Sequence, residues 1–190
     1  MEVKYDTWKL SDVLKKIDNG EIRLPNFQRD FRWGKNDIVE LIVSLLNGYP
    51  IGILLFWDVS QVEKGDRLDS RLFEGVDEKG ELSDVKYLVL DGQQRLTSLY
   101  QLLYKEFVVT KGGKEVKFFL NLQKIEEGEI DDCVEVYDKK VLQKRKLNEI
   151  KEQVKEHLLP LDILLNPNKI REFEEWKGEY KRQQLDPEIL

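Results

Sequence analysis

Residues 85–103 change from a strand pattern to a helical pattern within a few residues, and this change constrains the fold more than any other part of the sequence. Residues 85–90 (VKYLVL) form a short apolar run typical of a buried strand. Asp91 and Gly92 follow directly, and an Asp-Gly pair marks a turn. Over residues 96–103 the leucines then recur at helical spacing. The sequence therefore predicts a strand, a tight turn and a helix.

The remainder of the chain indicates an α+β fold. Apolar spacing predicts helices at residues 11–20, 35–47, 144–157 and 169–184. Short apolar runs predict strands at residues 21–24, 51–59, 107–110, 115–122 and 134–137. Residues 60–84 are polar and rich in Gly and Asp, so we expect an irregular surface excursion there. We predict a small mixed sheet on which helices 35–47 and 92–104 pack, followed by a helical C-terminal portion.

Composition excludes several classes of protein. Of 190 residues, 41% are hydrophobic and 36% are charged, so the chain can bury a core and is neither disordered nor collagen-like. The single cysteine and the single histidine exclude an internal disulfide and argue against a zinc site. The net charge of -6 is spread evenly along the chain. Any contact with DNA must therefore be local, because no global positive field exists.

The run from Leu41 to Trp57 carries no charge over 17 positions, a length near the lower limit for a membrane span. Residues 47–50 (NGYP) interrupt it with a helix stop and a turn. We therefore predict a buried helix, a reversal and a buried strand that begins near Ile51, and no membrane span. Lysine and aspartate recur throughout residues 1–20, which leaves no apolar core for a signal peptide. We therefore expect a cytoplasmic protein.

The DGQQR sequence at residues 91–95 is the strongest candidate for a functional site. A strand that turns through glycine into a helix directs backbone N–H groups and the positive end of the helix dipole to one place, which favours an anion. Arg95 can add a bidentate fork for phosphate, and Gln93 and Gln94 supply amides that can hold a ligand or orient a water molecule. Asp91 would repel phosphate unless a cation stood between them, which makes it a candidate Mg²⁺ ligand.

A purely structural interpretation of the same residues stays open. Asp91 followed by Gln94 three residues later is also a capping box, which stabilises the start of a helix without a ligand. Capping explains Asp91, Gly92 and Gln94, but it gives no reason for a second amide beside an arginine. The residues alone are compatible with a ligand site and with a helix cap.

Residues 25–34 (PNFQRDFRWG) form a second candidate. Arginines and aromatic residues alternate here: Phe27, Arg29, Phe31, Arg32 and Trp33. Such an arrangement can stack on a base and pair with a phosphate. The alternative is an ordered loop whose aromatic side chains pack on the core while its arginines pair with Asp30 and Asp37.

Three blocks occur in a set order: LPNFQRDFRW at residues 24–33, LNGYPIGILLFW at residues 46–57 and YLVLDGQQRLTSL at residues 87–99. This order closely resembles the N-terminal, nucleotide-dependent domain of GmrSD-type modification-dependent restriction systems, whose defining motif is DGQQR. The resemblance covers residues 8–104 and, more loosely, the LLPLDILL segment near Leu158. It implies a fold related to the one shared by ParB-type partition proteins and sulfiredoxin, in which a strand-turn-helix junction ending in Arg binds phosphate.

The resemblance also implies a function. In this family the binding and hydrolysis of an NTP control a DNA-cutting half, usually an HNH-type nuclease domain, in defence against phage with modified DNA. We therefore expect an NTP with Mg²⁺ as the cofactor and Asp91 as the metal ligand. The nucleotide site carried over to this sequence comprises Asp91, Gly92, Gln93, Gln94 and Arg95, with Gln28 and Arg29 from the facing loop. Of these, the resemblance marks as catalytic Asp91, Gln93, Gln94 and Arg95.

The resemblance further predicts a nucleotide-binding domain at residues 1–125 and the start of a helical region at residues 126–190. The family continues into a longer helical region and the nuclease domain, and neither precedes Leu190. We therefore expect a truncated chain or a short standalone relative, with the nuclease supplied by a missing domain or subunit. The preferred base, the DNA modification and the oligomeric state are left open.

Two other functions are compatible with the sequence. A DNA-binding module would use the same anion site for backbone phosphates and hydrolyse nothing. A structural interaction domain would need no ligand. DNA binding differs from nucleotide binding in its steep dependence on salt.

Overall fold

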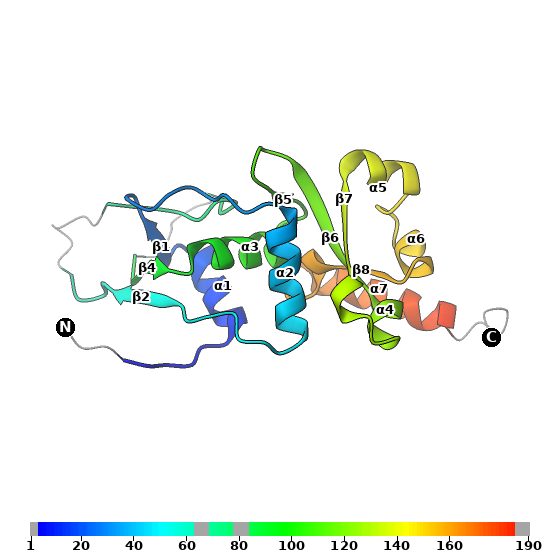
Figure 1. The fold of residues 1–190 in the computed structure, drawn as a ribbon, viewed down its shortest axis with the longest axis horizontal. Helices are drawn as coiled ribbons and strands as arrows, with labels where there is room; N and C mark the ends of the chain where they lie inside the picture. The colour runs from blue at the N-terminus through cyan, green and yellow to red at the C-terminus, as the bar shows by residue number, and fades with distance from the viewer. Residues whose placement is uncertain (1–3, 63–68, 78–83, 185–190) are drawn as a thin grey trace. The chain divides into compact units, whose positions relative to one another are not determined.

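The computed structural model describes residues 4–62, 69–77 and 84–184, and it confirms the α+β class. The chain divides into two compact units, each built around its own small sheet (Figure 1). The first unit comprises Met1–Phe31 and Gly52–Tyr100, and the second comprises Arg32–Ile51 and Gln101–Leu190. The expected domain boundary near residue 125 stays a prediction.

The first unit holds a mixed four-stranded sheet in the order β2-β4-β1-β3. Its elements are α1 (Leu10–Asp18), β1 (Ile22–Pro25), β2 (Leu55–Asp58), β3 (Ser70–Arg71), β4 (Tyr87–Asp91) and the first part of α3 (Gln93–Tyr104). β1 and β4 run parallel, with Ile22 opposite Tyr87, and the other pairs are antiparallel. The parallel pair lies at the centre of the sheet, so β4 delivers its C-terminal end to the start of α3.

The core of the first unit is formed by apolar side chains that recur at the expected spacing. The side chains buried there include Leu14, Ile17, Ile22, Leu24, Val89 and Leu96. Tyr100 of α3 is also buried, and its hydroxyl donates to Oδ1 of Asp18 at 2.6 Å. This bond satisfies the polar end of a buried aromatic residue and ties α3 to the end of α1.

The strand predicted from Ile51 is shorter and more exposed than expected. β2 begins at Leu55 and, among the described strands, pairs with β4 alone. On one face of this edge segment Ile53, Leu55 and Trp57 are exposed, while Phe56 turns the other way and stacks on Trp8 at 5.4 Å. The prediction of a buried strand was wrong because an uninterrupted apolar run does not distinguish an edge strand from a central one.

The reversal before this strand is confirmed. α2 (Lys35–Leu46) ends just before the predicted Asn-Gly stop, and the amide of Tyr49 donates to the carbonyl of Ser44 at 2.9 Å. Within the three described ranges, no helix is both long enough and apolar enough to cross a membrane.

The second unit holds an antiparallel sheet in which β6 pairs with β5, β7 and β8. Its strands are β5 (Val108–Val109), β6 (Glu115–Asn121), β7 (Val134–Asp138) and β8 (Leu158–Pro160). Its helices are α2, the end of α3, α4 (Leu122–Glu126), α5 (Lys139–Arg145), α6 (Ile150–Lys155) and α7 (Ile170–Gln184), with 3₁₀ turns at Ile130–Asp132, Leu161–Ile163 and Pro167–Lys169. The strands predicted at residues 107–110 and 115–122 correspond to β5 and β6, which pair antiparallel. We expected α2 on the mixed sheet, but it belongs to this unit and contacts β7.

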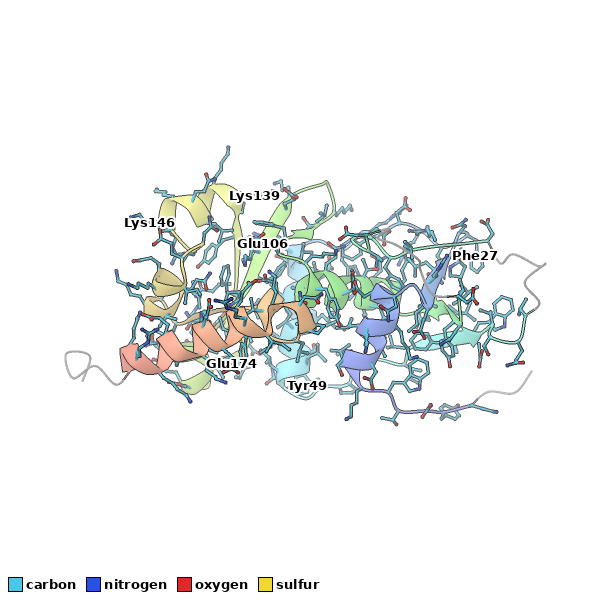
Figure 2. The ribbon with its side chains drawn as sticks, turned by 180° about the vertical axis from the view of Figure 1, so that it is seen from behind. Phe27, Tyr49, Glu106, Lys139, Lys146 and Glu174 are labelled. Carbon is cyan, nitrogen blue, oxygen red and sulfur yellow. The ribbon has the colours of Figure 1, made fainter. Side chains whose placement is uncertain are left out.

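The single helix predicted at residues 144–157 is wrong, because the chain breaks it at Lys146. This residue adopts the left-handed conformation with φ of 56°, and it lies at the turn that follows α5 (Figure 2). The amide of Leu147 then donates to the carbonyl of Leu142 at 2.9 Å. Both leucines are buried in one cluster with Phe119 and Leu158, so their burial stabilises a Schellman-type end at a residue that is not glycine.

Candidate functional site at the β4–α3 junction

The strand-turn-helix predicted around DGQQR is confirmed. β4 ends at Asp91, α3 begins at Gln93, and Gly92 between them has φ of +96°. This backbone conformation favours glycine, and a Cβ atom at Gly92 would lie 2.3 Å from Cδ2 of Leu54, so a larger residue would also displace that side chain. The carbonyl of Gly92 accepts the first helical bond, from the amide of Leu96 at 2.9 Å. Gly92 therefore occupies the N-cap position that the capping-box alternative gave to Asp91.

The bonds that hold Arg95 at the start of α3 include those to oxygen atoms of Ile53 and Asp91. Its Nη2 donates to the carbonyl of Ile53 at 3.0 Å and to Oδ2 of Asp91 at 3.1 Å. The Arg95 side chain is 17% exposed, whereas that of Asp91 is 71% exposed. A Cβ atom at Gly52 would lie 2.6 Å from Nη1 of Arg95. The guanidinium is thus fixed against the chain before β2, and the Asp91 carboxylate beside it faces solvent.

Gln93 and Gln94 bind the facing loop through their amide groups. They are 5% and 8% exposed. Nε2 of Gln93 donates to the carbonyl of Arg29 at 2.6 Å, and Nε2 of Gln94 donates to the carbonyl of Asp30 at 3.2 Å. The capping-box interpretation gave no reason for a second amide beside Arg95. The structure gives one, because both glutamine side chains hold the backbone of the loop.

Gln28 makes the reverse connection, from the loop to the end of β4. Its Nε2 donates to the carbonyls of Val89 and Leu90 at 2.7 and 2.9 Å. The structure therefore places the Gln28 side chain against the two residues that directly precede the DGQQR sequence. Gln28 and these two residues lie more than sixty residues apart in the sequence, so this contact had no local signal.

Arg29 differs from the other predicted residues, because its side chain is exposed. Within the part of the chain that the structure describes, its guanidinium has no hydrogen bond or ion pair. The neighbouring Phe27 is 81% exposed (Figure 2). The loop alternative expected its arginines to pair with Asp30 and Asp37, but the ion pair of Asp30 is with Arg71 at 3.5 Å, and Asp37 accepts from the amide of Gly34 at 2.7 Å. The loop thus presents an aromatic ring and a cation to solvent.

Arg71 and Glu74 take part in the site although sequence reasoning did not select them. Nη2 of Arg71 donates to the carbonyls of Gln28 and Arg29 at 3.2 and 3.1 Å, and Oε1 of Glu74 accepts from the amide of Phe31 at 3.1 Å. They lie in the segment expected to be an irregular excursion. Phe73 of the same segment is buried, so this part of the excursion is anchored to the core.

The site can bind a magnesium ion only if most of the oxygen ligands come from a bound nucleotide and water. Among the described residues, no group of three or more His, Cys, Asp or Glu side chains is placed to hold a metal. Asp91 supplies one exposed carboxylate. Mg²⁺ in nucleotide sites is commonly bound by one or two carboxylates together with phosphate oxygens and water, so a single Asp is compatible with a metal-nucleotide complex.

Comparison with known proteins gives the family. The profile of the GmrSD restriction endonuclease N-terminal domain matches residues 10–186. The chain is also similar to the uncharacterized protein MJ0686 of Methanocaldococcus jannaschii, with 37% identity over 179 residues that cover 89% of this chain. The chain spans 30% of the length of that relative. On the profile match, which includes α3 and the whole DGQQR junction, the chain belongs to the GmrSD restriction endonuclease N-terminal domain family.

Proposed function

We propose that this domain binds a nucleoside triphosphate with Mg²⁺ at the β4–α3 junction and hydrolyses it. The observation that carries the proposal is the pairing of the Arg95 guanidinium with the exposed Asp91 carboxylate, 3.1 Å apart, at the start of a helix. Membership of the GmrSD family supports it.

The proposed phosphate site combines a helix start with two arginines. The first amides of α3 have no partner within the helix, and they carry the positive end of its dipole. Arg95 needs little reorganisation to bind phosphate, because its guanidinium is already held by Ile53 and Asp91. Arg29 adds a second cation from the loop. The backbone around Arg29 is held by Gln93, Gln94 and Arg71. The loop is therefore fixed, while the side chain of Arg29 is exposed.

Asp91 would hold the metal, and its exposed carboxylate is accessible to a metal-nucleotide complex. Mg²⁺ held there would neutralise phosphate charge and would favour transfer of the terminal phosphoryl group to water. In this proposal Gln93 and Gln94 place the attacking water while their amides retain the loop. Arg95 and Arg29 stabilise the charge on the phosphate oxygens.

We further propose that nucleotide hydrolysis here controls a DNA-cutting domain or subunit. The family name refers to a restriction endonuclease, and the chain spans only 30% of its relative. The partner would therefore lie in another part of a longer protein or in another chain. Its substrate would be DNA with modified bases, as in the systems that the sequence resembles.

A thermal-shift panel tests nucleotide binding. The chain is heated with each of ATP, GTP, CTP and UTP at millimolar concentration, with and without Mg²⁺. A ligand that binds only the folded state raises the melting temperature by mass action, so we expect a rise with at least one nucleotide and a smaller rise without Mg²⁺. No rise with any of the four would contradict the proposal. Phosphate release with the best nucleotide then tests hydrolysis.

Arg29→Ala is the informative variant, and Arg171→Ala is its matched control. Both arginines are exposed, and among the described residues the ion pair of Arg171 is a local one with Glu175 in α7. Arg29→Ala should reduce the nucleotide-dependent shift without lowering the melting temperature of the free protein, whereas Arg171→Ala should change neither. Equal effects of the two variants would show that only the net charge matters.

The DNA-binding alternative uses the same residues and is separated by salt. The exposed Phe27 and Arg29 would suit a stacked base and its phosphate equally well. Binding of a DNA backbone weakens steeply as salt concentration rises, because counterions are released. DNA binding without any nucleotide-dependent shift would favour that alternative.

A further inference from the structure

The loop of residues 28–31 has no regular secondary structure, yet side chains from other segments bind its backbone. Nη2 of Arg71 lies between the carbonyls of Gln28 and Arg29, at 3.2 and 3.1 Å. Oε1 of Glu74 accepts from the amide of Phe31 at 3.1 Å. The backbone on both sides of Arg29 is therefore held from the segment around β3.

Arg71 is itself fixed in place. β3 pairs with β1, and this pairing puts Arg71 opposite Leu24. Nη1 of Arg71 donates to the same Oε1 of Glu74, at 3.0 Å. One guanidinium thus joins a strand, a carboxylate and two loop carbonyls, which its planar fork of donors allows and a lysine ammonium does not.

The charges around the two arginines differ. Arg71 lies within ion-pair distance of two carboxylates, Glu74 at 3.0 Å and Asp30 at 3.5 Å. Arg29 has no such partner among the described residues. The charge of Arg71 is therefore already balanced by carboxylates, whereas that of Arg29 is exposed and can bind a phosphate. The two arginines thus differ in what they can contribute to the site.

We propose that Arg71 and Glu74 are positioning residues that hold the loop so that Arg29 is presented to the nucleotide phosphate. The inference rests on the proposed function. Arg71 and Glu74 do not touch the nucleotide themselves. They act through the backbone of Arg29, by removing conformations of the loop that binding would otherwise have to exclude.

Nucleotide affinity in a double-mutant cycle tests this division of tasks. The dissociation constant of the Mg²⁺ complex of the tightest-binding of the four NTPs is measured for wild type, Arg71→Met, Arg29→Ala and the double variant. Methionine keeps most of the aliphatic stem of Arg71 and removes its donors. Arg71→Met should weaken binding by about tenfold, which corresponds to ~1.4 kcal/mol. In the Arg29→Ala background the same change should have little further effect.

Conservative variants separate positioning from charge. Glu74→Gln keeps an oxygen that accepts from the amide of Phe31, so its affinity should stay within about twofold of wild type, while Glu74→Ala should behave like Arg71→Met. Asp30→Asn removes the exposed carboxylate beside Arg71 and leaves the backbone contacts, so it should be silent. Melting temperatures of all variants show whether each remains folded.

Four results would overturn the inference, the last of them together with the proposed function. Equal losses from Arg71→Met with and without Arg29 would show that Arg71 acts independently of Arg29. An Asp30→Asn loss as large as that of Arg71→Met would show a charge effect. Wild-type affinity in Arg71→Met would remove its role while leaving the proposed function intact. Absence of nucleotide binding in the wild type would instead overturn the proposed function, and this inference with it.

Discussion

Gly52 and Arg95 are in such close contact that a Cβ atom at Gly52 would lie 2.6 Å from Nη1 of Arg95. Gly52 also has φ of +89°, a conformation that costs other residues roughly 1–2 kcal/mol. Gly52→Ala should therefore lower the free energy of unfolding by more than this strain alone and should displace Arg95. We expect weaker nucleotide binding together with a lower melting temperature.

Gly128→Ala is the matched control for this variant. Gly128 has φ of +82°, but a Cβ atom there would have nothing within 4 Å. It should show the cost of backbone strain and no change in nucleotide binding. If the two variants lose equal stability and neither loses affinity, the contact between Gly52 and Arg95 is not needed to hold the guanidinium.

Asp91→Asn separates metal binding from structure. The Asp91 side chain is 71% exposed, so loss of its ion pair with Arg95 should change the free energy of unfolding by about 0.5 kcal/mol or less. An amide carries no negative charge, so the variant should lose the Mg²⁺ dependence of nucleotide binding and the release of phosphate. Melting temperature and phosphate release are measured on the same samples. Turnover equal to that of an active wild type would remove Asp91 from the catalytic residues.

Gln28 should matter for stability because it is the connection from the loop to β4. Gln28→Ala leaves the carbonyls of Val89 and Leu90 without their side-chain donor, which should cost about 1–3 kcal/mol. Gln28→Glu should cost more at neutral pH, because it places a carboxylate against two carbonyl oxygens. Gln123→Ala, at an exposed pair with Glu127, is the control and should be nearly silent. Chemical denaturation of the three variants checks the order.

The stability of the first unit should depend on pH through Glu21. The hydrogen bond from Lys86 lowers the pKa of Glu21 below its ordinary value of 4.5; burial opposes this, and Lys16 assists it. The folded carboxylate therefore takes up a proton at lower pH than the unfolded one. Its stabilisation is complete above the unfolded pKa and is lost as the pH falls through the folded pKa.

Denaturation of wild type and Glu21→Gln from neutral to acid pH tests this linkage. The variant should be less stable than wild type near neutral pH, and the difference should shrink as the pH falls below the unfolded pKa. Glu40→Gln, at an exposed position of α2, should follow the wild-type curve. A constant difference between wild type and Glu21→Gln at all pH values would contradict the assigned pKa direction.

The sequence predicted those parts of the site whose conformation is set by neighbouring residues in the chain. Gly92 lies between an apolar run and helical leucine spacing, and the turn there needs only these neighbours. The hydrogen bonds of Gln93 and Gln94 could not be predicted from the sequence, because their partners are the carbonyls of Arg29 and Asp30 in a loop far away along the chain. The DGQQR motif indicated that the two side-chain amides bind something, but it could not indicate that they bind the backbone of this loop.

The errors have a related origin. Lys146 ends α5 in a left-handed conformation without the glycine or asparagine that usually signals it, and the reason is the burial of Leu142 and Leu147 in one cluster. Arg71 was missed because Arg-Leu-Phe-Glu has no periodicity that distinguishes it from a surface segment. In both places tertiary contacts decide the conformation, and local sequence patterns do not encode them.

The pairing of β1 with β4 has a consequence for how the protein is made. Ile22 pairs with Tyr87, so β1 leaves the ribosome about 65 residues before its parallel neighbour does. At typical translation rates this interval lasts on the order of several seconds, far longer than the microseconds that a short helix such as α1 needs to form. During this interval the Ile22–Pro25 segment lacks the strand that it pairs with in the fold, so a chaperone or another nascent chain can bind it. The yield of folded protein should accordingly depend on the speed of translation as well as on the stability of the finished fold.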